Sequence, residues 1–429
     1  MLTLACLPPL ASIAAIAISC ASAPCPITDL AALLKSATWT DTAPFASVAS
    51  APCASTPLGK DQAREATALL WDWHIGHLRA ARKAEWSAKS ITRGNLTMKF
   101  DYKVFGDKPA AGRSLFISMH GGGETKAAVN ESQWQNQIGL YTPAEGVYLA
   151  PRAPNDAWNM WHQPHIDHFF ARIIDNAVAL EGVDPARVYL MGFSAGGDGV
   201  YQLAPRMADY FAAAAMMAGH PNDAQSDNLR NLPFAIHMGA NDGAFNRNTV
   251  AQQWGARLAA LAAADTGGYP HIVKLHQGKG HWMDREDAVA VPWMATYTRN
   301  AAPERVVWVQ AGAAHNRLYW LATDSSARGN RLDVRRDKNV FTVAADSTIN
   351  SFTLLLSDAI ADLDAPIIVR RGAAAATDAP DTNSDLTFPP PQRTIATICD
   401  ALTRRADPAM AFSASVNVVL PAAKPGTTP

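Results

Sequence analysis

Apolar residues recur at helical spacing in one long segment near the N-terminus. Over residues 61–86 the side chains of Trp71, Ile75 and Leu78 follow one another at intervals of four and three positions. This spacing puts them on one face of a helix. The pattern therefore predicts a long helix, which we assign to an N-terminal helical segment over residues 24–95.

The middle of the chain alternates between strand-like and helix-like patterns. Residues 114–120, "SLFISMH", form a short and nearly continuous apolar run, which is typical of a strand buried on both faces. Similar runs follow, separated by helical patterns around 165–181, from 195, around 246–264 and around 284–298. This order predicts βαβ units and a mostly parallel, doubly wound sheet, and we assign an α/β domain to residues 96–300.

Helical patterns give way to short strands after about residue 300. Segments such as "ERVVWVQ" and "SFTLLLS" follow one another with turns about every eight to twelve residues. They predict a small antiparallel all-β domain, sandwich-like, over residues 301–372. Residues 373–429 begin with a Pro-, Ala-, Thr- and Asp-rich linker. A last helix and strand follow it, and we expect this tail to pack back onto the second domain.

Composition is that of a globular protein with a sizeable core. The chain has 429 residues, enough for two or three domains, and 48% of them are apolar. Its 37 Lys and Arg against 38 Asp and Glu leave a net charge of -1, so there is no basic excess to bind a nucleic acid. No segment after the N-terminus is apolar for long enough to cross a bilayer, so we expect no transmembrane span.

The first 23 residues resemble an export signal. They are apolar, rich in small residues and free of charge, and they end in Ala21-Ser22-Ala23, which fits a cleavage site. Cys20 offers a second route, a lipid-modified cysteine that would anchor the chain. A disordered leader is the alternative, because no Lys or Arg precedes the apolar run. We expect export, to the periplasm, the medium or a lipid anchor.

The cysteines outside this leader are too few for a framework of disulfides. Cys25 and Cys53 flank a short segment and would pair in an oxidising compartment, leaving Cys399 unpaired. The sequence holds no Cys-x-x-Cys, so zinc has no thiolate ligand set.

A run of histidines raises the question of a metal. His162, His165 and His168 are three positions apart, but Asp167 is the one carboxylate near them and the spacing fits no familiar ligand set. We therefore expect neither a metal site nor a cofactor.

The pentapeptide Gly192-Phe193-Ser194-Ala195-Gly196 is the strongest candidate for chemistry. It follows an apolar strand and precedes a helical pattern, which is the setting of a nucleophile elbow. Small residues let the chain turn sharply there, so that Ser194 stands exposed at the edge of the sheet. The alternative is an ordinary serine in a Gly-rich turn.

A serine hydroxyl needs a neighbouring base, and the base needs an acid to orient it. Asp242 ends the strand "LPFAIHMGAND", and His281 follows a later strand and a Gly-Lys-Gly loop. Both lie in the order that the elbow motif requires, acid before histidine. We therefore predict Asp242 as the acid and His281 as the base. The weaker alternatives are Asp198, Asp284, His220, His237 and His276.

His120-Gly121-Gly122-Gly123 follows the strand 114–119 and is a candidate oxyanion loop. Backbone N–H groups of Gly121 or Gly122, together with that of Ala195, would stabilise a developing negative charge. An ordinary Gly-rich loop is the alternative.

Aromatic and histidine side chains from neighbouring loops are candidates for substrate contact. Trp158 and Trp161 lie in a loop between two strands, and His220 follows a strand. We expect these three and His120 to lie at the cleft. The alternative is that the tryptophans simply pack the loop.

The motifs "HGGG", "APRAP", "VDPARVYLMGFSAGG", "MGANDGAF" and "GKGHWMD", in this order, resemble the α/β-hydrolase superfamily. Within it they are similar to bacterial esterases grouped near secreted polyhydroxybutyrate depolymerases and feruloyl esterases. The resemblance covers roughly residues 96–300. It implies an α/β-hydrolase fold, a serine esterase with nucleophile Ser194, acid Asp242 and base His281, and no cofactor.

The implied substrate is a small-molecule or polymeric carboxylic ester. After the serine the sequence departs from the depolymerase pattern, with "AGGDGVY" in place of "AGGAM", so a polyester is not the default. Two alternatives stay open: a serine peptidase of the prolyl-oligopeptidase type, and a catalytically inactive binding or adhesion protein.

Overall fold

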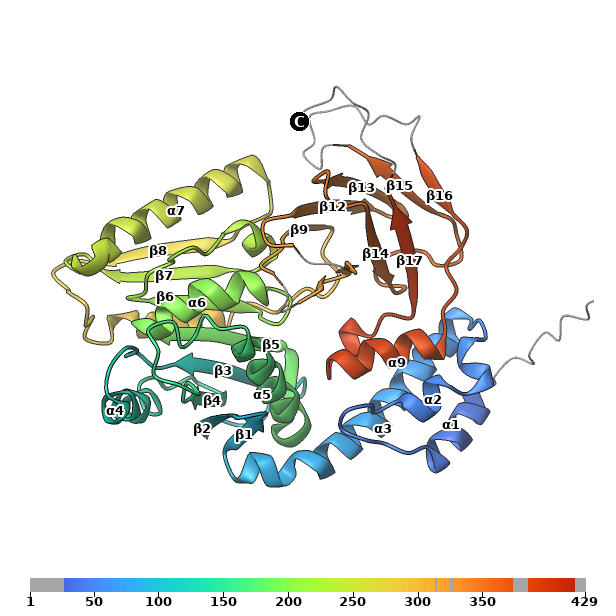
Figure 1. Cartoon of the computed structure of the whole chain (residues 1–429), viewed down its shortest axis with the longest axis horizontal. Helices are drawn as coiled ribbons and strands as arrows, with labels where there is room; N and C mark the ends of the chain where they lie inside the picture. The colour runs from blue at the N-terminus through green and yellow to red at the C-terminus, as the bar shows by residue number, and fades with distance from the viewer. Residues whose placement is uncertain (1–26, 313–314, 325–326, 373–384, 421–429) are drawn as a thin grey trace, which may run out of the picture.

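The computed structural model describes residues 27–312, 315–324, 327–372 and 385–420, and Figure 1 shows their arrangement. The expected leader with Cys20, the residue Cys25 that follows it, and the main part of the expected linker lie outside these residues. In the part of the chain that is described, no helix is long and apolar enough to span a membrane.

A mostly parallel sheet organises the middle of the chain. Within the described residues it has eight strands in the order β1-β2-β4-β3-β5-β6-β7-β8. The first two pairings, β1 with β2 and β2 with β4, are antiparallel, and the other five are parallel. The strands are β1 Ser90–Arg93, β2 Leu96–Phe105, β3 Arg113–Met119, β4 Gly146–Pro151, β5 Val183–Phe193, β6 Ala213–Met217, β7 Phe234–Gly239 and β8 His271–His276. This confirms the predicted α/β-hydrolase fold.

The central strands are buried on both faces, which explains their continuous apolar sequences. In β5, Val188 and Leu190 belong to the core on one face, whereas Tyr189 and Met191 belong to the core on the other. Successive side chains of a strand point to opposite faces, so a strand covered on both sides needs an apolar residue at every position.

Helices cover both faces of this sheet. On one face lie α5 His165–Glu181, α6 Ala195–Arg206 and α7 Arg247–Ala264, and on the other lie α4 Ala127–Gln137 and α8 Ala290–Met294. The helix expected over 284–298 is shorter than predicted, a 3₁₀ turn η4 Glu286–Val289 followed by α8. Its start is delayed because Asp284 and Arg285 both have positive φ, 53° and 66°, which a helix does not accommodate.

The N-terminal helices form a separate apolar cluster with a helix from the C-terminal tail. They are α1 Ile27–Ser36, α2 Ala46–Ala49, the 3₁₀ turn η1 Pro52–Ser55 and α3 Lys60–Ser87. Buried leucines of α1 and α3 pack with Ile398 and Leu402 of α9 Ile395–Arg404. The tail helix therefore covers the N-terminal helices at the lower right of Figure 1 rather than the sandwich alone.

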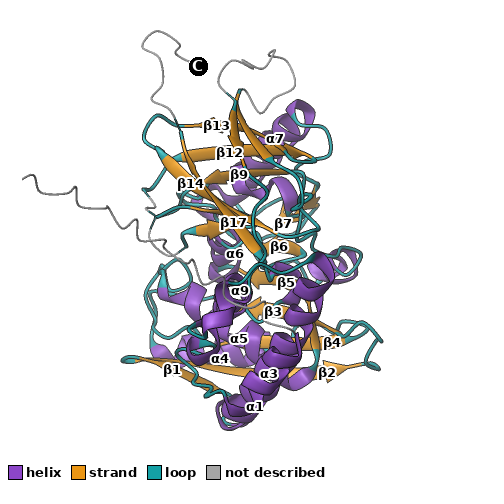
Figure 2. Cartoon of the chain, turned by 90° about the vertical axis from the view of Figure 1, so that its right-hand side faces the viewer, coloured by secondary structure: helices purple, strands orange, loops and turns teal. Residues whose placement is uncertain are grey.

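The remaining strands form two further sheets, one facing the other beside the hydrolase sheet (Figures 1 and 2). Within the described residues the larger has the order β16-β15-β13-β12-β9 and the smaller β10-β11-β14-β17. The pairing of β13 with β15 is parallel, so the expectation of a purely antiparallel domain is wrong at this point. The tail strand β17 joins this region by pairing with β14. The strands are β9 Arg305–Val309, β10 Arg317–Leu318, β11 Leu321–Ala322, β12 Arg331–Asp337, β13 Val340–Ala345, β14 Ser351–Leu356, β15 Ile367–Arg371, β16 Leu386–Phe388 and β17 Ala414–Val419.

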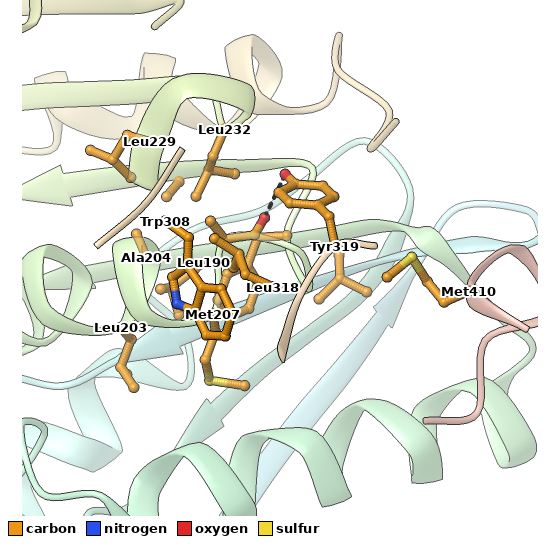
Figure 3. Close-up of a cluster of buried hydrophobic side chains, with 14 of the residues drawn as sticks. Leu190, Leu203, Ala204, Met207, Leu229, Leu232, Trp308, Leu318, Tyr319 and Met410 are labelled. Carbon is orange, nitrogen blue, oxygen red and sulfur yellow. Dashed lines mark hydrogen bonds between the residues drawn. The ribbon is translucent and has the colours of Figure 1, made fainter. Parts of the chain in front are cut away.

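The two smaller sheets, which we call the sandwich, share their core with the eight-stranded sheet, which we call the hydrolase sheet. Trp308 of β9 and Leu318 of β10 belong to the same cluster of buried side chains as Leu203 and Met207 at the end of α6 (Figure 3). The Tyr319 hydroxyl donates a hydrogen bond to the Ala208 carbonyl across this junction, at 3.1 Å. The two regions are therefore joined by buried apolar surface rather than by a flexible tether.

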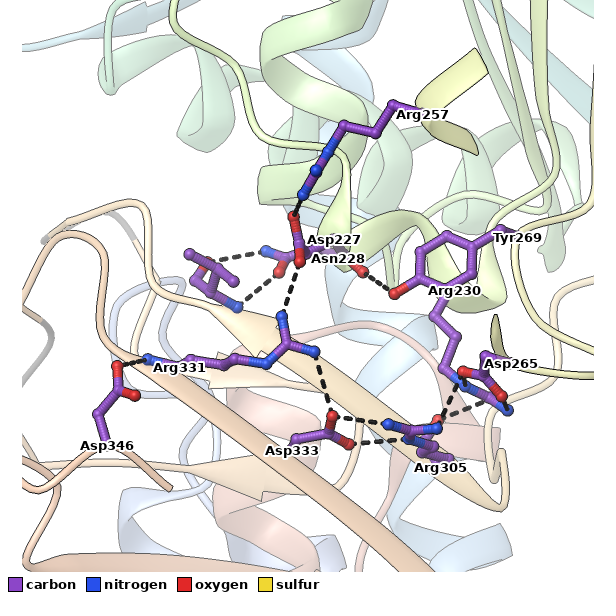
Figure 4. A network of polar contacts seen from close by, with 11 residues as sticks. Asp227, Asn228, Arg230, Arg257, Asp265, Tyr269, Arg305, Arg331, Asp333 and Asp346 are labelled. Atoms are coloured by element: carbon purple, nitrogen blue, oxygen red, sulfur yellow. Dashed lines mark hydrogen bonds and ion pairs between the residues drawn. The ribbon is translucent and has the colours of Figure 1, made fainter. Parts of the chain in front are cut away.

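Arginine–carboxylate pairs reinforce the same junction (Figure 4). Arg305 of β9 donates to Asp333 of β12 through Nε and Nη2, at 2.9 and 2.8 Å, and its Nη1 lies 3.2 Å from Asp265 of the hydrolase region. Arg331 bridges in the same way, from Asp333 to Asp227 in the 3₁₀ turn η2 Asp227–Asn231. These paired guanidinium groups, one largely buried and one partly exposed, fix the relative orientation of the two regions.

Candidate active site

Ser194 occupies a strained turn between β5 and α6. Its φ of 59° and ψ of -122° lie where a non-glycine residue is rarely found. The neighbouring glycines make this turn possible. A Cβ atom at position 192 would lie 2.3 Å from the Gly196 carbonyl oxygen, and one at 196 would lie 2.2 Å from the Met119 carbonyl oxygen. The backbone of α6 thus approaches β5 and β3 closely, and Ser194 is held at the carboxyl edge of the sheet.

The structure brings His281 and Asp242 to this serine. His281 Nε2 lies 2.9 Å from Ser194 Oγ, and His281 Nδ1 lies 2.7 Å from Asp242 Oδ2. With the carboxylate accepting a hydrogen bond from Nδ1–H, Nε2 carries the lone pair and accepts a hydrogen bond from the serine hydroxyl group. Asp242 is 3% exposed, so its carboxylate is shielded from water that would weaken this contact.

The loops that carry Asp242 and His281 are joined to each other by their backbones. Ala240 N–H donates to the His276 carbonyl at 2.9 Å, and Asn241 N–H donates to the Lys279 carbonyl at 2.8 Å. Because adjacent parallel strands end at the same edge of the sheet, two loops distant in sequence meet there.

The alternative acids and bases lie elsewhere. His276 contacts His237 and Glu286, with ring nitrogens 3.1 Å from each partner, and Asp284 pairs with Lys279 Nζ at 2.7 Å. Burial lowers the pKa of His237 to about 3, so this side chain is a neutral core residue near neutral pH.

Asp198, in the first turn of α6, faces the cavity side of the serine rather than the base. It accepts a hydrogen bond from the His220 backbone N–H at 2.6 Å. Burial raises the pKa of Asp198 to about 6, although this hydrogen bond and the charge of Arg247 act in the opposite direction. Arg247 Nη1 lies 3.9 Å from Asp242 Oδ1, and Arg247 lines the same cavity as Asp198.

The glycine loop after β3 lies directly against the serine. A Cβ atom at Gly121 would be 3.0 Å from Ser194 Cβ, and Gly122 has a φ of 107°. Gly122 and Ala195 line the same cavity as Ser194. The backbone of both segments is therefore within reach of a carbonyl bound at the serine.

Asn130 of α4 holds this loop in place, a role that the sequence pattern did not reveal. It is fully buried; its Oδ1 accepts from Gly123 N–H at 2.8 Å, and its Nδ2 donates to Asp156 Oδ1 at 2.8 Å. Asp156 in turn pairs with Arg152. A buried amide in a helix after a Gly-rich loop was the available signal, but the helical pattern alone does not show which face is buried.

His120 and Trp161 are not among the residues that line the cavity beside Ser194, and their contact with a substrate stays a prediction. Both are buried, at 0% and 1% exposure, and Trp161 Nε1 donates to the His120 carbonyl at 3.0 Å. The His120 ring closes the loop from within, with Nδ1 at 2.6 Å from the Gly121 carbonyl oxygen and Nε2 accepting from Ala153 N–H at 3.2 Å. Burial lowers its pKa to about 4, which keeps the ring neutral.

A cavity of about 370 Å³ opens beside Ser194, and it includes the other two candidates for substrate contact, Trp158 and His220. Trp158 is 54% exposed, so its ring is available to a ligand. The other lining residues are Gly122, Gly123, Glu124, Ala195, Asp198, Asn222, Phe245 and Arg247. Apolar rings and several polar groups therefore converge on one serine.

The remaining candidates for metal and thiol chemistry are placed as follows. Among the described residues, no group of three or more His, Cys, Asp or Glu side chains is arranged to hold a metal ion. Asp167 pairs instead with Arg206 and with His315 Nε2. Cys53 and Cys399 are free thiols in the described part of the chain, and the pairing of Cys53 with Cys25 stays a prediction.

Comparison with known proteins agrees with this architecture. Residues 147–306 match the model of the dienelactone hydrolase family. Poly(3-hydroxyalkanoate) depolymerase C of Paucimonas lemoignei is 30% identical over 137 residues, which cover 30% of this chain and 32% of that protein. NocK of Nocardia uniformis subsp. tsuyamanensis, named as a candidate esterase, is 32% identical over 117 residues, which cover 25% of this chain and 33% of that protein.

These alignments span about a third of the length of each relative. Among solved structures, the poly(3-hydroxybutyrate) depolymerase LpqC of Bordetella parapertussis is 16% identical, with a TM-score of 0.36, over 48% of this chain and 87% of that one. The strand order, the strained serine after β5 and the family match together identify the fold. The chain has an α/β-hydrolase fold, its residues 147–306 match the dienelactone hydrolase family, and it is similar to esterases with that fold.

Proposed function

We propose that this protein hydrolyses carboxylic esters with Ser194 as nucleophile, His281 as general base and acid, and Asp242 as the acid that orients His281. The observation that carries the proposal is the hydrogen-bonded chain from Ser194 Oγ through His281 to Asp242, with distances of 2.9 and 2.7 Å. A serine in this chain is activated, because the imidazole accepts its proton as the oxygen attacks.

The reaction proceeds in two halves. Ser194 Oγ attacks the ester carbonyl carbon while its proton passes to His281 Nε2, and the carbonyl oxygen becomes an oxyanion facing the N–H groups of Gly121 or Gly122 and of Ala195. The tetrahedral intermediate then expels the alcohol, which takes the proton from His281. Water, deprotonated by the same imidazole, attacks the acyl-enzyme, and the carboxylic acid leaves as Ser194 regains its proton.

Turnover of short-chain 4-nitrophenyl esters tests this proposal, with Ser194→Ala as the comparison. We expect loss of turnover by a factor of about 10⁴ or more in the variant, because the nucleophile is removed. Undiminished turnover in Ser194→Ala would contradict the assignment.

Labelling with a fluorophosphonate distinguishes an esterase from an inactive binding protein. An activated serine is phosphonylated, whereas a serine without a base is not. Labelling of the wild type that disappears in Ser194→Ala supports the enzyme, and an unlabelled wild type supports the binding protein.

We also propose that the protein is exported, on the strength of the apolar leader in residues 1–23. N-terminal sequencing of the protein recovered from outside the cytoplasm tests this. A mature chain that begins at Cys20 supports export with a lipid anchor, and one that begins just after Ala23 supports export after cleavage by a signal peptidase. A chain that stays in the cytoplasm with its leader attached contradicts export.

A further inference from the structure

The cavity beside Ser194 borders a second and larger one. The second cavity has a volume of about 810 Å³ and lies where the hydrolase region meets the sandwich. Trp158 and Asn222 line both cavities. The exposed ring of Trp158 thus stands at the boundary between them, where a ligand that extends from Ser194 past this ring would enter the second cavity.

The first cavity lies on the acyl side of the serine. Its lining includes Gly122, Ala195 and Ser194, which would surround the carbonyl group of a bound ester. His281, also a described residue, is not on that wall. Because His281 must deliver its proton to the departing alcohol, the alcohol leaves on the His281 side, and the acyl chain takes the cavity.

The far wall of the second cavity belongs to the sandwich. Val309, Gln310 and Ala311 at the end of β9, with Arg328 and Gly329, line it opposite the hydrolase loops. This wall is fixed rather than mobile relative to the serine. Asn228 of η2 donates to the Val309 carbonyl at 3.0 Å and accepts from Val309 N–H at 2.6 Å, and the shared core and ion pairs of Figures 3 and 4 lie beside it.

The charged side chains of the second cavity are paired with opposite charges. Arg328 pairs with Asp223 across the cavity, from the sandwich to the hydrolase region, and Arg206 donates to the buried Asp167 at 2.8 Å. Burial also lowers the pKa of the lining residue His162 to about 4, so its ring is neutral near neutral pH. An uncharged ligand therefore fits this cavity better than a charged one.

Amide side chains make the cavity polar all the same. The residues that supply them are Asn159, Gln202, Asn222 and Gln225, whereas the amides of Asn228 and Gln310 are hydrogen-bonded within the protein through both oxygen and nitrogen. A plain alkyl chain would cover these amides without offering them a partner, which costs free energy for each group that loses water. A chain with its own oxygen or nitrogen atoms does not incur that cost.

We propose that the sandwich completes the acyl-binding cleft, and that the substrate is an ester whose uncharged acyl chain carries hydrogen-bonding oxygen or nitrogen atoms and extends from Ser194 past Trp158 into the second cavity. This inference rests on the proposed ester hydrolysis and adds the class of acyl group to it. It also gives the sandwich a direct role in substrate selection.

Two series of 4-nitrophenyl esters test the acyl class with one leaving group. The first consists of unbranched alkanoates and the second of methoxy-terminated oligoether carboxylates of matching length. We expect kcat/KM to rise with length in the oligoether series and to exceed that of the alkanoate of equal length by about tenfold or more. A flat oligoether series, or a preference for the alkanoates, would overturn the inference.

Two bulky substitutions test the role of the second cavity. Ala311→Trp fills it from the sandwich wall, and Gln225→Trp fills it from the hydrolase side; both positions are exposed, so the fold tolerates the larger ring. We expect each to lower kcat/KM for the longest oligoether ester about tenfold and to leave 4-nitrophenyl acetate unchanged. Ser347→Trp, at an exposed turn of the sandwich away from this cavity, is the matched control and should change neither.

The outcomes separate this inference from the proposed function. If 4-nitrophenyl acetate is hydrolysed through Ser194 but both cavity variants treat long and short esters alike, the acyl-cleft inference is wrong and the esterase stands. If no ester is hydrolysed, or Ser194→Ala keeps full turnover, the proposed function fails and the inference fails with it.

Discussion

Gly239, the last residue of β7, lies in direct contact with Gly280, the residue that precedes His281. A Cβ atom at position 239 would lie 1.9 Å from the Gly280 carbonyl oxygen. The loop that carries Asp242 and the loop that carries His281 therefore pack backbone against backbone, and the 2.7 Å contact between their side chains depends on this spacing.

Substitution of Gly239 by alanine should separate the two loops. The new methyl group displaces the Gly280 carbonyl and moves His281 relative to Ser194, so we expect kcat for 4-nitrophenyl acetate to fall about 100-fold, as small misplacements of reacting groups do. Gly243→Ala is the matched control, because a Cβ there meets no atom within 4 Å. Equal activity of the two variants would contradict the proposed coupling of the loops.

Asp242→Asn should lower kcat by about 10³–10⁴-fold with little change in stability. The amide cannot stabilise the imidazolium, and it favours the wrong tautomer of His281. Steady-state kinetics on the same ester measure the effect. Asp284→Asn, on the exposed carboxylate that pairs with Lys279, should retain activity, and similar losses in both variants would argue against Asp242 as the orienting acid.

Asn130→Ala should impair the oxyanion loop without touching the serine. The variant removes the acceptor of the Gly123 N–H, a half-buried donor that then loses this partner. We expect kcat to fall about tenfold or more while KM changes little, because the loop acts on the transition state. Asn136→Ala, an exposed position of the same helix, is the control. A loss confined to KM would contradict this role.

His237 should make stability depend on pH in a predictable direction. Its folded-state pKa, about 3, lies below the ordinary value of 6.5, so the unfolded chain binds the proton first as the pH falls. The contribution of His237 is thus intact above pH 6.5 and is lost on acidification, by about 2 kcal/mol at pH 5. Urea unfolding measures the effect: between pH 7 and pH 5 the free energy of unfolding of the wild type should fall relative to that of His237→Leu. A difference independent of pH would contradict this reasoning.

Trp308→Ala should destabilise the whole protein rather than the sandwich alone. Trp308 is 3% exposed in the core that joins the two regions. Its truncation leaves a cavity and should lower the free energy of unfolding by about 3–5 kcal/mol. We expect one cooperative calorimetric transition at a lower temperature, because the core is shared. Val419→Ala, at a position 64% exposed, is the control and should shift the transition little. Two separate transitions would show that the regions fold independently.

Local pattern was enough to predict most of the elements and to single out three residues that the folded chain brings into hydrogen-bond contact, Ser194, Asp242 and His281. The apolar runs became buried strands because a sheet covered on both faces requires them, and Ser194, Asp242 and His281 meet because strands that run parallel end at one edge. Because each of the three residues follows a strand of this sheet, their positions in the sequence were enough to predict that they lie close together. The motif "GFSAG" also indicates the sharp turn at Ser194, because only glycine fits at positions 192 and 196, where β5, β3 and α6 approach one another.

Contacts between segments distant in the sequence could not be predicted and became visible only in the folded protein. No pattern near His120 or Trp161 indicates that both turn inward, because burial depends on the loop that closes over them. Nor does any local feature pair β13 with β15 in parallel, bring β17 to β14, or place α9 on the N-terminal helices. Short strands accept several partners with similar energy, and the choice falls to the arrangement that buries the most apolar surface of the whole chain. The second cavity owes its far wall to that same choice.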